Sequence, residues 1–235
     1  MLRKICRLIF IIGVTGIVSL MLWPYHDGAL RYGMPLSLLA MWSACLVFVW
    51  KKIPHRIGLL ALPLLAVIPF CLPGKPFDRV LLRDHYVAEM RQFEGTPYLW
   101  GGEGSRGIDC SGLPRRALRD ALLADGWNRG NGAAFREWLK QWWFDTSAKA
   151  MGESYRGFTR SLGIKGRLKE LDFSRLHPGD LAVTSSGVHV MIYVGEGEWI
   201  QAEPKLGKVV TSDPRIDPSA WFDMEVGVHC WTILD

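Results

Sequence analysis

Residues Gly95–Gly112 read G-T-P-Y-L-W-G-G-E-G-S-R-G-I-D-C-S-G and place one cysteine, Cys110, directly after a glycine-rich loop. A helical pattern follows at once, with apolar residues at Leu113, Leu118 and Leu122. Unpaired backbone N–H groups at the N-terminus of a helix favour an anion. We therefore expect a cysteine pKa below its usual value of about 8.5, a populated thiolate and a nucleophilic role for Cys110.

A thiolate nucleophile needs a histidine as its base and a polar group that orients the imidazole ring. Among the six histidines, His189 stands in the run S-S-G-V-H-V-M-I-Y-V-G, where a turn signal precedes an alternating strand pattern. A tight turn at residues 195–198 then leads to W-I-Q-A-E, the second strand of a predicted hairpin. We predict that Gln201 on this strand lies beside His189 and holds its ring through the side-chain amide.

Three motifs in this order resemble the NlpC/P60 family of papain-like cell-wall peptidases: G-T-P-Y-L-W-G-G…G-I-D-C-S-G-L, then L-H-P-G-D-L-A-V, then G-V-H-V-M-I-Y-V-G. The resemblance covers roughly Val80 to Leu234. Members of this family cleave amide bonds in peptidoglycan stem peptides, typically between D-Glu and the diamino acid. The resemblance implies a cysteine-type endopeptidase with Cys110 as nucleophile, His189 as general base and Gln201 as third residue. That third position is more often histidine in the family.

The resemblance also implies substrate contacts next to the nucleophile. Tyr98 matches the family's tyrosine at this place, and Asp109 and Ser111 match positions that line the substrate subsite. We expect Asp109 to hold a free α-amino group of the stem peptide. The backbone N–H of Cys110 and the Tyr98 hydroxyl are expected to stabilise the oxyanion. No cofactor is implied, and no metal site is expected because C-x-x-C and H-x-x-x-H spacings do not occur.

The expected fold is an α+β, papain-like NlpC-type domain in which the nucleophile helix packs on an antiparallel sheet of about five strands. Helices are predicted at Phe77–Phe93 and from Cys110 to about Ala124. The stretch Trp127–Gly166 is longer than the family's usual connection, and its aromatic residues follow amphipathic-helix spacing. Three roles stay open for this stretch: packing on the domain body, covering the cleft as a lid, or contact with the membrane surface. The predicted strands are Asp180–Ser185, His189–Val194, Glu198–Ala202, Val209–Thr211 and Gly227–Leu234.

The first 73 residues differ in kind, because they contain uncharged apolar runs at Leu8–Trp23, Tyr32–Trp50 and Ile57–Pro73. Each run approaches the roughly 17–25 residues that a helix needs to cross a bilayer; the third is short and contains Pro63 and Pro69. A cleavable signal peptide is the alternative for the first run, but no small-x-small cleavage pattern follows it. We therefore predict a membrane anchor of about three transmembrane helices in residues 1–73 and the peptidase domain in residues 74–235.

Charges around the apolar runs predict the orientation. Basic residues flank the runs at two places, Arg3, Lys4 and Arg7 before the first run, and Lys51, Lys52 and Arg56 between the second and third. By the positive-inside rule, both places face the cytoplasm. Three crossings then put the catalytic domain on the extracytoplasmic (periplasmic) side of a bacterial cytoplasmic (inner) membrane. Peptidoglycan lies on that side.

The overall basic charge belongs to the anchor. Residues 1–73 hold seven Lys or Arg and one acid, a net charge of +6, whereas the remaining residues hold 21 basic and 22 acidic side chains, a net charge of −1. Nucleic-acid binding by the second part is therefore not expected. The expected partners are a peptidoglycan or muropeptide substrate and the lipid bilayer, and no protein partner is predicted.

Two classes of function stay open at this stage. The first is the membrane-anchored peptidase. The second keeps the fold with another role: an amidase or acyltransferase on a lipid or another amide, or a catalytically silent cell-wall-binding module. Cys110 precedes His189, which favours the peptidase, because permuted lipid-acting relatives place the histidine first. The five cysteines are expected to form no structural disulfide, since a catalytic thiol must stay free.

Overall fold

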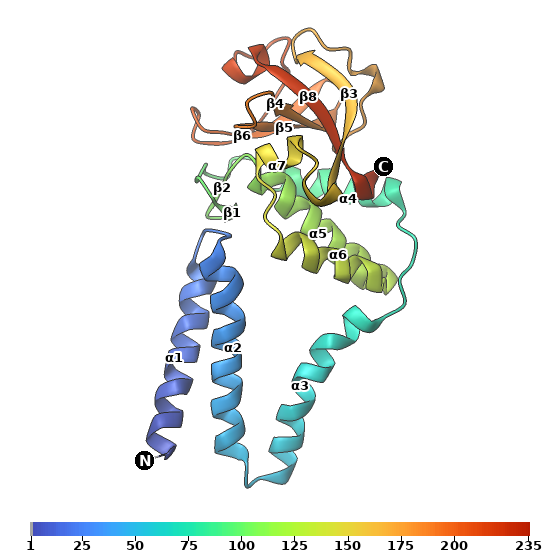
Figure 1. Cartoon of the computed structure of the whole chain (residues 1–235). Helices are drawn as coiled ribbons and strands as arrows, with labels where there is room; N and C mark the ends of the chain where they lie inside the picture. The colour runs from blue at the N-terminus through green and yellow to red at the C-terminus, as the bar shows by residue number, and fades with distance from the viewer. Residues whose placement is uncertain (1) are drawn as a thin grey trace. The chain divides into compact units, whose positions relative to one another are not determined.

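The computed structural model describes residues 2–235, and the chain divides into two compact units (Figure 1). One unit ends at Leu72 and consists of long helices. The other spans Pro73–Asp235 and combines helices with a sheet. The division coincides with the end of the apolar runs in the sequence.

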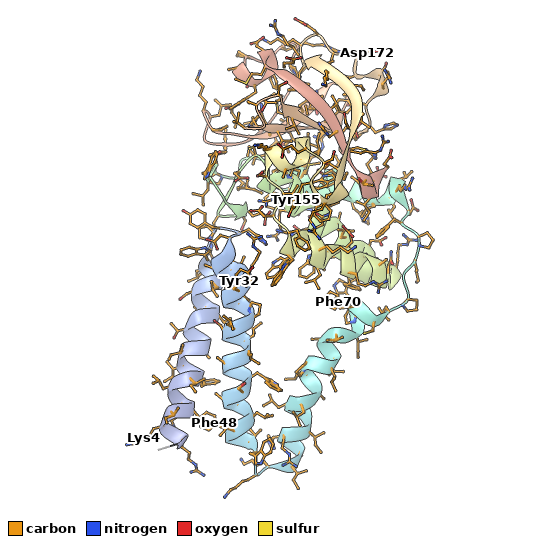
Figure 2. The ribbon with its side chains drawn as sticks, in the orientation of Figure 1. Lys4, Tyr32, Phe48, Phe70, Tyr155 and Asp172 are labelled. Atoms are coloured by element: carbon orange, nitrogen blue, oxygen red, sulfur yellow. The ribbon has the colours of Figure 1, made fainter. Side chains whose placement is uncertain are left out.

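Three helices make up the first unit: α1 (Leu2–Leu22), α2 (Gly28–Val49) and α3 (Ile53–Cys71). They have 21, 22 and 19 residues, and all three are long and apolar enough to cross a membrane. Apolar side chains along them are exposed, among them Tyr32 and Phe48, which are labelled in Figure 2. Exposure of apolar side chains along a whole helix is typical of a membrane span.

The third helix is longer than its apolar run, since it begins four residues before Ile57. Pro54 lies in its first turn, where the missing N–H costs no hydrogen bond. Pro63 and Pro69 lie inside α3, so each removes one backbone donor without ending the helix. The prediction of three long apolar helices is confirmed.

Helices α1 and α2 approach each other at glycines. A Cβ atom on Gly13 would lie 2.9 Å from the Met41 backbone nitrogen, and one on Gly16 would lie 2.5 Å from the Ser37 hydroxyl oxygen. Small residues permit such contact between helices in a bilayer, where close packing drives association.

The second unit contains four α-helices, four short 3-10 helices and eight strands. The helices are α4 (Arg79–Arg91), α5 (Gly112–Arg129), α6 (Gly132–Trp143), α7 (Ala148–Gly152), η1 (Tyr155–Gly157), η2 (Phe173–Arg175), η3 (Ala220–Asp223) and η4 (Thr232–Leu234). The strands are β1 (Glu103–Gly104), β2 (Gly107–Ile108), β3 (Thr159–Arg167), β4 (Leu181–Thr184), β5 (Val190–Gly195), β6 (Glu198–Glu203), β7 (Lys208–Ser212) and β8 (Glu225–Trp231).

Six of these strands form one antiparallel sheet in the order β3-β8-β4-β5-β6-β7. The sheet has one strand more than the sequence predicted, because β3 lies in the stretch that was expected to connect helix and sheet. As an edge strand with the sequence T-R-S-L-G-I-K-G-R, β3 lacks the clean apolar alternation that identifies a half-buried strand. Strands β1 and β2 form a separate two-stranded ribbon inside the glycine-rich loop.

Both faces of the sheet are covered, and the helices α4 and α5 lie against one of them (Figure 1). On the helix side, Leu118 and Ile192 belong to one apolar cluster. On the other side, Met191, Trp199 and Phe222 belong to a second cluster. Consecutive residues of β5 thus alternate between the two clusters. The predicted α+β arrangement, with the helix after Cys110 packed on an antiparallel sheet, is confirmed.

Helix α5 is longer than predicted. It continues past Ala124 to Arg129, where Gly130 adopts a left-handed conformation (φ 58°) and ends the helix. Pro114 lies in its first turn, where proline is tolerated. Helix α4 is shorter than the predicted Phe77–Phe93, because the Asp78 side chain caps it by accepting a hydrogen bond from the Leu81 amide.

Candidate active site

Asp109 fixes the backbone around the N-terminus of α5. Its Oδ1 accepts hydrogen bonds from the Ser111 amide (3.0 Å), the Ser111 hydroxyl (3.0 Å) and the Gly112 amide (2.6 Å). Its Oδ2 accepts one from the Gly101 amide at 2.8 Å. The carboxylate therefore ties the glycine-rich loop to the first turn of α5, where backbone donors and the helix dipole favour a negative charge. Cys110 lies between these tied residues.

Glycines allow the loop to close on the helix. A Cβ atom on Gly112 would clash with the Gly102 carbonyl oxygen, and one on Gly102 would lie 2.5 Å from the Gly107 carbonyl oxygen. No side chain tolerates such distances, so the close approach of backbone to backbone requires glycine here. The glycines thus set the position of Cys110 relative to the loop.

The Cys110 thiol is nearly buried, with 5% of the residue exposed. It donates a weak hydrogen bond to the Val188 carbonyl oxygen, 3.9 Å from Sγ. Burial, followed by the Asp109 charge, raises the pKa of the thiol to about 12, while the backbone N–H groups of Val190, Ser111 and Cys110 lower it by less. The lowered pKa predicted from the sequence is therefore wrong. The helix N-terminus acts in the expected direction, but the loss of water outweighs it.

His189, directly before β5, and Gln201, on the neighbouring strand β6, are brought together. The His189 Nε2 lies 2.7 Å from the Gln201 Oε1. Because an amide oxygen only accepts hydrogen bonds, this contact assigns the proton to Nε2 and a lone pair to Nδ1. Among residues 2–235, the buried Nδ1 has no hydrogen-bond partner. Burial lowers the pKa of His189 to about 4, while the Gln201 hydrogen bond and the charges of Glu203 and Asp109 raise it by less.

The Cys110 thiol lies against the chain on both sides of His189. His189 directly precedes β5, and its two neighbours both contact the thiol: Val188 through its carbonyl oxygen and Val190 through its backbone N–H. The chain around His189 therefore runs past the Cys110 sulfur. His189 and Gln201 are each 1% exposed, whereas Val188 is 53% exposed. The sulfur thus lies directly beneath a surface residue.

Trp221 and Glu203, which the sequence analysis missed, complete the surroundings of the imidazole. The Trp221 ring stacks on the His189 ring, with centroids 4.1 Å apart and planes inclined by 17°. The Trp221 Nε1 donates to Glu203 Oε1 at 3.1 Å, and the Ser219 hydroxyl donates to Glu203 Oε2 at 3.0 Å. Glu203 follows Gln201 by two positions on β6 and so shares its face, a signal available in the sequence. No comparable signal marks Trp221.

Tyr98 is influenced by charges on both sides of the site, near the start of α5 and on β6. It is half-buried, and its backbone amide donates to the Gly207 carbonyl oxygen at 2.8 Å. Burial raises the pKa of Tyr98 to about 12, and the charges of Cys110, Asp109 and Glu203 add to this effect. The Tyr98 hydroxyl is therefore within electrostatic reach of the helix N-terminus and of the sheet.

Comparisons with known proteins identify a family for this chain. The family model described as the NlpC/P60 family matches residues 95–226. The chain belongs to the NlpC/P60 family. This confirms the resemblance given by the sequence motifs. No curated protein matches the chain.

Several solved structures are similar to this NlpC/P60 chain. The peptidoglycan hydrolase RipB from Mycobacterium tuberculosis is 20% identical, with a TM-score of 0.41 over 67% of this chain and 67% of RipB. The NlpC/P60 domain of the peptidoglycan hydrolase SagA is 25% identical, with a TM-score of 0.39 over 62% of this chain and 97% of that domain. NlpC1 from Trichomonas vaginalis is 18% identical, with a TM-score of 0.42 over 63% of this chain and 43% of NlpC1.

A buried ion-pair network supports the loop of the NlpC/P60 domain. Glu103 on β1 lies 3.0 Å from the Arg115 Nε through Oε1 and 2.6 Å from an Arg119 guanidinium nitrogen through Oε2. Arg115 also pairs with Asp145. Removing one partner of a buried pair costs roughly 3–5 kcal/mol. The network therefore couples the glycine-rich loop strongly to α5. The sequence analysis did not identify it.

Within residues 2–235, no group of three or more His, Cys, Asp or Glu side chains could hold a metal ion. The five cysteines are free thiols. His229 and Cys230 are adjacent on β8 and so point to opposite faces of the sheet.

Proposed function

We propose that this chain is a membrane-anchored cysteine-type endopeptidase that hydrolyses peptidoglycan stem peptides, at the amide bond between D-Glu and the diamino acid. Membership of the NlpC/P60 family supports this reaction class. One observation carries the assignment of the triad: the 2.7 Å contact between His189 Nε2 and Gln201 Oε1. This contact leaves the His189 Nδ1 unprotonated and able to act as a base. The residues on either side of His189 contact the Cys110 thiol.

The resting site holds a neutral thiol and a neutral imidazole, because the pKa of Cys110 is raised to about 12 and the pKa of His189 is lowered to about 4. Proton transfer therefore accompanies attack on the substrate rather than preceding it. The sulfur bonds to the carbonyl carbon while the thiol proton passes to Nδ1 of His189. The Gln201 carbonyl oxygen keeps its hydrogen bond from Nε2–H and stabilises the imidazolium.

The tetrahedral intermediate needs donors for its oxyanion. The backbone N–H of Cys110 and the Tyr98 hydroxyl fill this role, and each such donor lowers the barrier by about 3 kcal/mol. The raised pKa of Tyr98 keeps its hydroxyl protonated and able to donate at neutral pH. The C–N bond then breaks, and His189 gives its proton to the leaving amine. Water hydrolyses the thioester with His189 as base and frees the thiol.

Asp109 and Ser111 line the subsite for the free α-amino group of the stem peptide. Asp109 Oδ1 already accepts three hydrogen bonds, whereas Oδ2 accepts one, from Gly101. A carboxylate oxygen has two lone pairs, so Oδ2 has room for an ammonium donor. Substrate binding through Oδ2 leaves the capping of α5 through Oδ1 intact.

The helices of the first unit and the flanking charges support the location. Helices α1, α2 and α3 are each long enough to span, and three crossings put the two ends of the anchor on opposite sides. The basic residues in the first two turns of α1 and around the start of α3 mark the cytoplasmic side. The NlpC/P60 domain then lies on the extracytoplasmic side, where its substrate is.

The proposal is tested with the full chain in detergent micelles or lipid nanodiscs, acting on defined muropeptides with mass-spectrometric detection. The native chain is expected to cut at the D-Glu bond, and Cys110→Ala is expected to lower the rate by about 10⁴-fold or more. Cys230→Ala is the matched control, because it removes a buried thiol outside the site and is expected to keep activity. Unchanged muropeptides with the native chain, or a fully active Cys110→Ala variant, would contradict the proposal.

A further inference from the structure

The outer side of α6 combines basic and apolar residues. Arg136, Leu139, Lys140 and Trp143 are all exposed and follow the i, i+3, i+4, i+7 spacing of one helix face. Trp127, near the end of α5, is 68% exposed and packs edge to face on a phenylalanine of α6, with ring centroids 4.9 Å apart. We call these five residues the aromatic-basic face.

The start of α6 is tied to the chain that leaves α3. Helix α3 ends at Cys71, and two positions later the Pro73 carbonyl oxygen accepts a hydrogen bond from the Gly132 amide at 3.1 Å. The Lys75 amide donates to the side chain of Asn131, which caps α6, at 2.8 Å. Two residues of chain span at most about 7 Å, and the hydrogen bond to Gly132 adds 3.1 Å. Helix α6 therefore begins within roughly 10 Å of the end of α3, whatever the orientation of the two units.

This short tether limits the distance between α6 and a membrane, and the inference rests on the proposed anchoring of residues 1–73. A spanning helix ends near the boundary of the hydrocarbon core, and the headgroup layer beyond it is about 5–8 Å thick. The first turn of α6 therefore lies in the headgroup layer or directly beside it. The helix has 12 residues and is about 18 Å long. The tether fixes where α6 begins but not whether the helix runs along the membrane or away from it.

We infer that α6 lies along the membrane surface, with the aromatic-basic face in the headgroup layer, so that the partner of this face is the lipid bilayer itself. Tryptophan is favoured at headgroup depth because its ring is apolar and its N–H is polar. Arg136 supplies positive charge for lipid phosphates, and so does Lys140, whose exposed ammonium group also pairs with Glu137 at 3.1 Å. The stems of both side chains lie on the apolar layer. A helix directed away from the membrane would expose Leu139, Trp143 and Trp127 to water. Contact with lipid holds the catalytic domain against the membrane.

The test uses the full chain in vesicles of phosphatidylethanolamine and phosphatidylglycerol, with photoreactive p-benzoylphenylalanine at one position at a time. Replacement of Leu139 or Trp143 is expected to give about tenfold more lipid adduct than replacement of Ile216, which is 80% exposed on the loop after β7. Replacement of Leu64, an exposed residue of α3, reports on the anchor. If the photoreactive residue at position 64 forms no lipid adduct, the proposed anchoring is overturned. If position 64 forms an adduct but positions 139, 143 and 216 form equal amounts, the anchoring stands and only the inference about α6 is overturned.

A charge variant provides a second readout. With the photoreactive residue at Trp127, the double change Leu139→Glu and Trp143→Glu is expected to reduce the lipid adduct about tenfold, whereas Ile216→Glu leaves it unchanged. Both changes are at exposed positions outside the candidate site, so hydrolysis of muropeptides in detergent is expected to continue. Cross-links to a second copy of the chain in place of lipid would overturn the inference and assign the face to self-association.

Discussion

The two halves of the candidate site are held together in different ways. The helix half is local, because Asp109 accepts all four of its hydrogen bonds from donors no more than eight positions away. The sheet half is assembled from distant parts of the chain. His189 contacts Gln201 12 positions away, and Glu203 contacts Trp221 18 positions away.

This difference predicts how each half responds to substitution. The helix half forms when its loop forms, so changes there act mainly on stability and on the position of the thiol. The sheet half depends on the register of β5 and β6 and on the return of η3 to the sheet. Changes there act mainly on the imidazole, through its orientation and its pKa. The two halves are therefore separable by measuring unfolding and pH dependence on the same variants.

The largest effect is expected from Asp109→Ala. The change removes four hydrogen bonds, three of them to backbone amides at the loop and helix N-terminus, and should destabilise the domain by about 2–4 kcal/mol. Thermal unfolding of the full chain followed by circular dichroism measures this. Asp120→Ala is the control, because Asp120 pairs at 2.7 Å with the partly exposed Arg116 on the same helix and should cost less than about 1 kcal/mol. Equal losses for both variants would refute a structural role for Asp109.

A smaller effect on stability, with a clear effect on rate, is expected from Gln201→Ala. Without its Oε1 acceptor, the His189 ring is no longer held, and a misplaced base lowers kcat/KM on the order of 10²-fold. Steady-state kinetics on a single muropeptide measures this. Thr211→Ala on the adjacent strand β7 is a control for packing, and it should keep the rate. A Gln201→Ala variant with native kinetics would remove Gln201 from the proposed triad.

The pH profile of Gln201→Glu sharpens this prediction. The carboxylate keeps an acceptor for Nε2–H and adds a negative charge, which favours the imidazolium and raises the pKa of His189 above about 4. In the proposed mechanism, activity requires the neutral imidazole, so the acidic limb of kcat/KM, expected near pH 4 in the native chain, should move to higher pH. An unmoved limb would show that another group sets it.

The helix half was largely readable from the sequence, because its contacts join residues that are close in the chain. The glycine-rich run indicated a loop directly before Cys110, and Cys110 was placed before the helix that the structure shows. The close backbone approach at Gly102 and Gly112 was not predicted. The role of Asp109 as a cap was not foreseen. Its spacing to Ser111 and Gly112 carried that signal, since a carboxylate two or three positions before a helix amide is a typical cap.

The remaining features of the site could be recognised only from the three-dimensional structure. The hairpin pattern placed His189 near Gln201, but Trp221 reaches the imidazole only because the chain after β7 returns to the sheet. The pKa of Cys110 was predicted in the wrong direction for the same reason. The helix N-terminus is a local feature, whereas the burial that outweighs it is supplied by the whole domain. Strand β3 escaped prediction because it lies at an edge, where few side chains are buried.

A smaller effect is expected from Glu203→Gln. The change keeps the shape of the side chain but removes a charge that raises the pKa of His189, so the pKa should fall below about 4. The acidic limb of kcat/KM then moves to lower pH, opposite to Gln201→Glu, with little loss of rate at neutral pH. Glu198→Gln is the control on the same strand, because Glu198 is exposed and pairs with Arg91.

The same measurement on Asp109→Asn decides whether the two halves are separate. The Asp109 charge also raises the pKa of His189, but it contributes less than the Gln201 hydrogen bond and the Glu203 charge. Asp109→Asn should therefore shift the acidic limb less than Glu203→Gln does, while it destabilises the domain more. A larger shift in Asp109→Asn would place the imidazole under the control of the helix N-terminus. The site would then act as one electrostatic unit, and the helix half and the sheet half would differ only in how they fold.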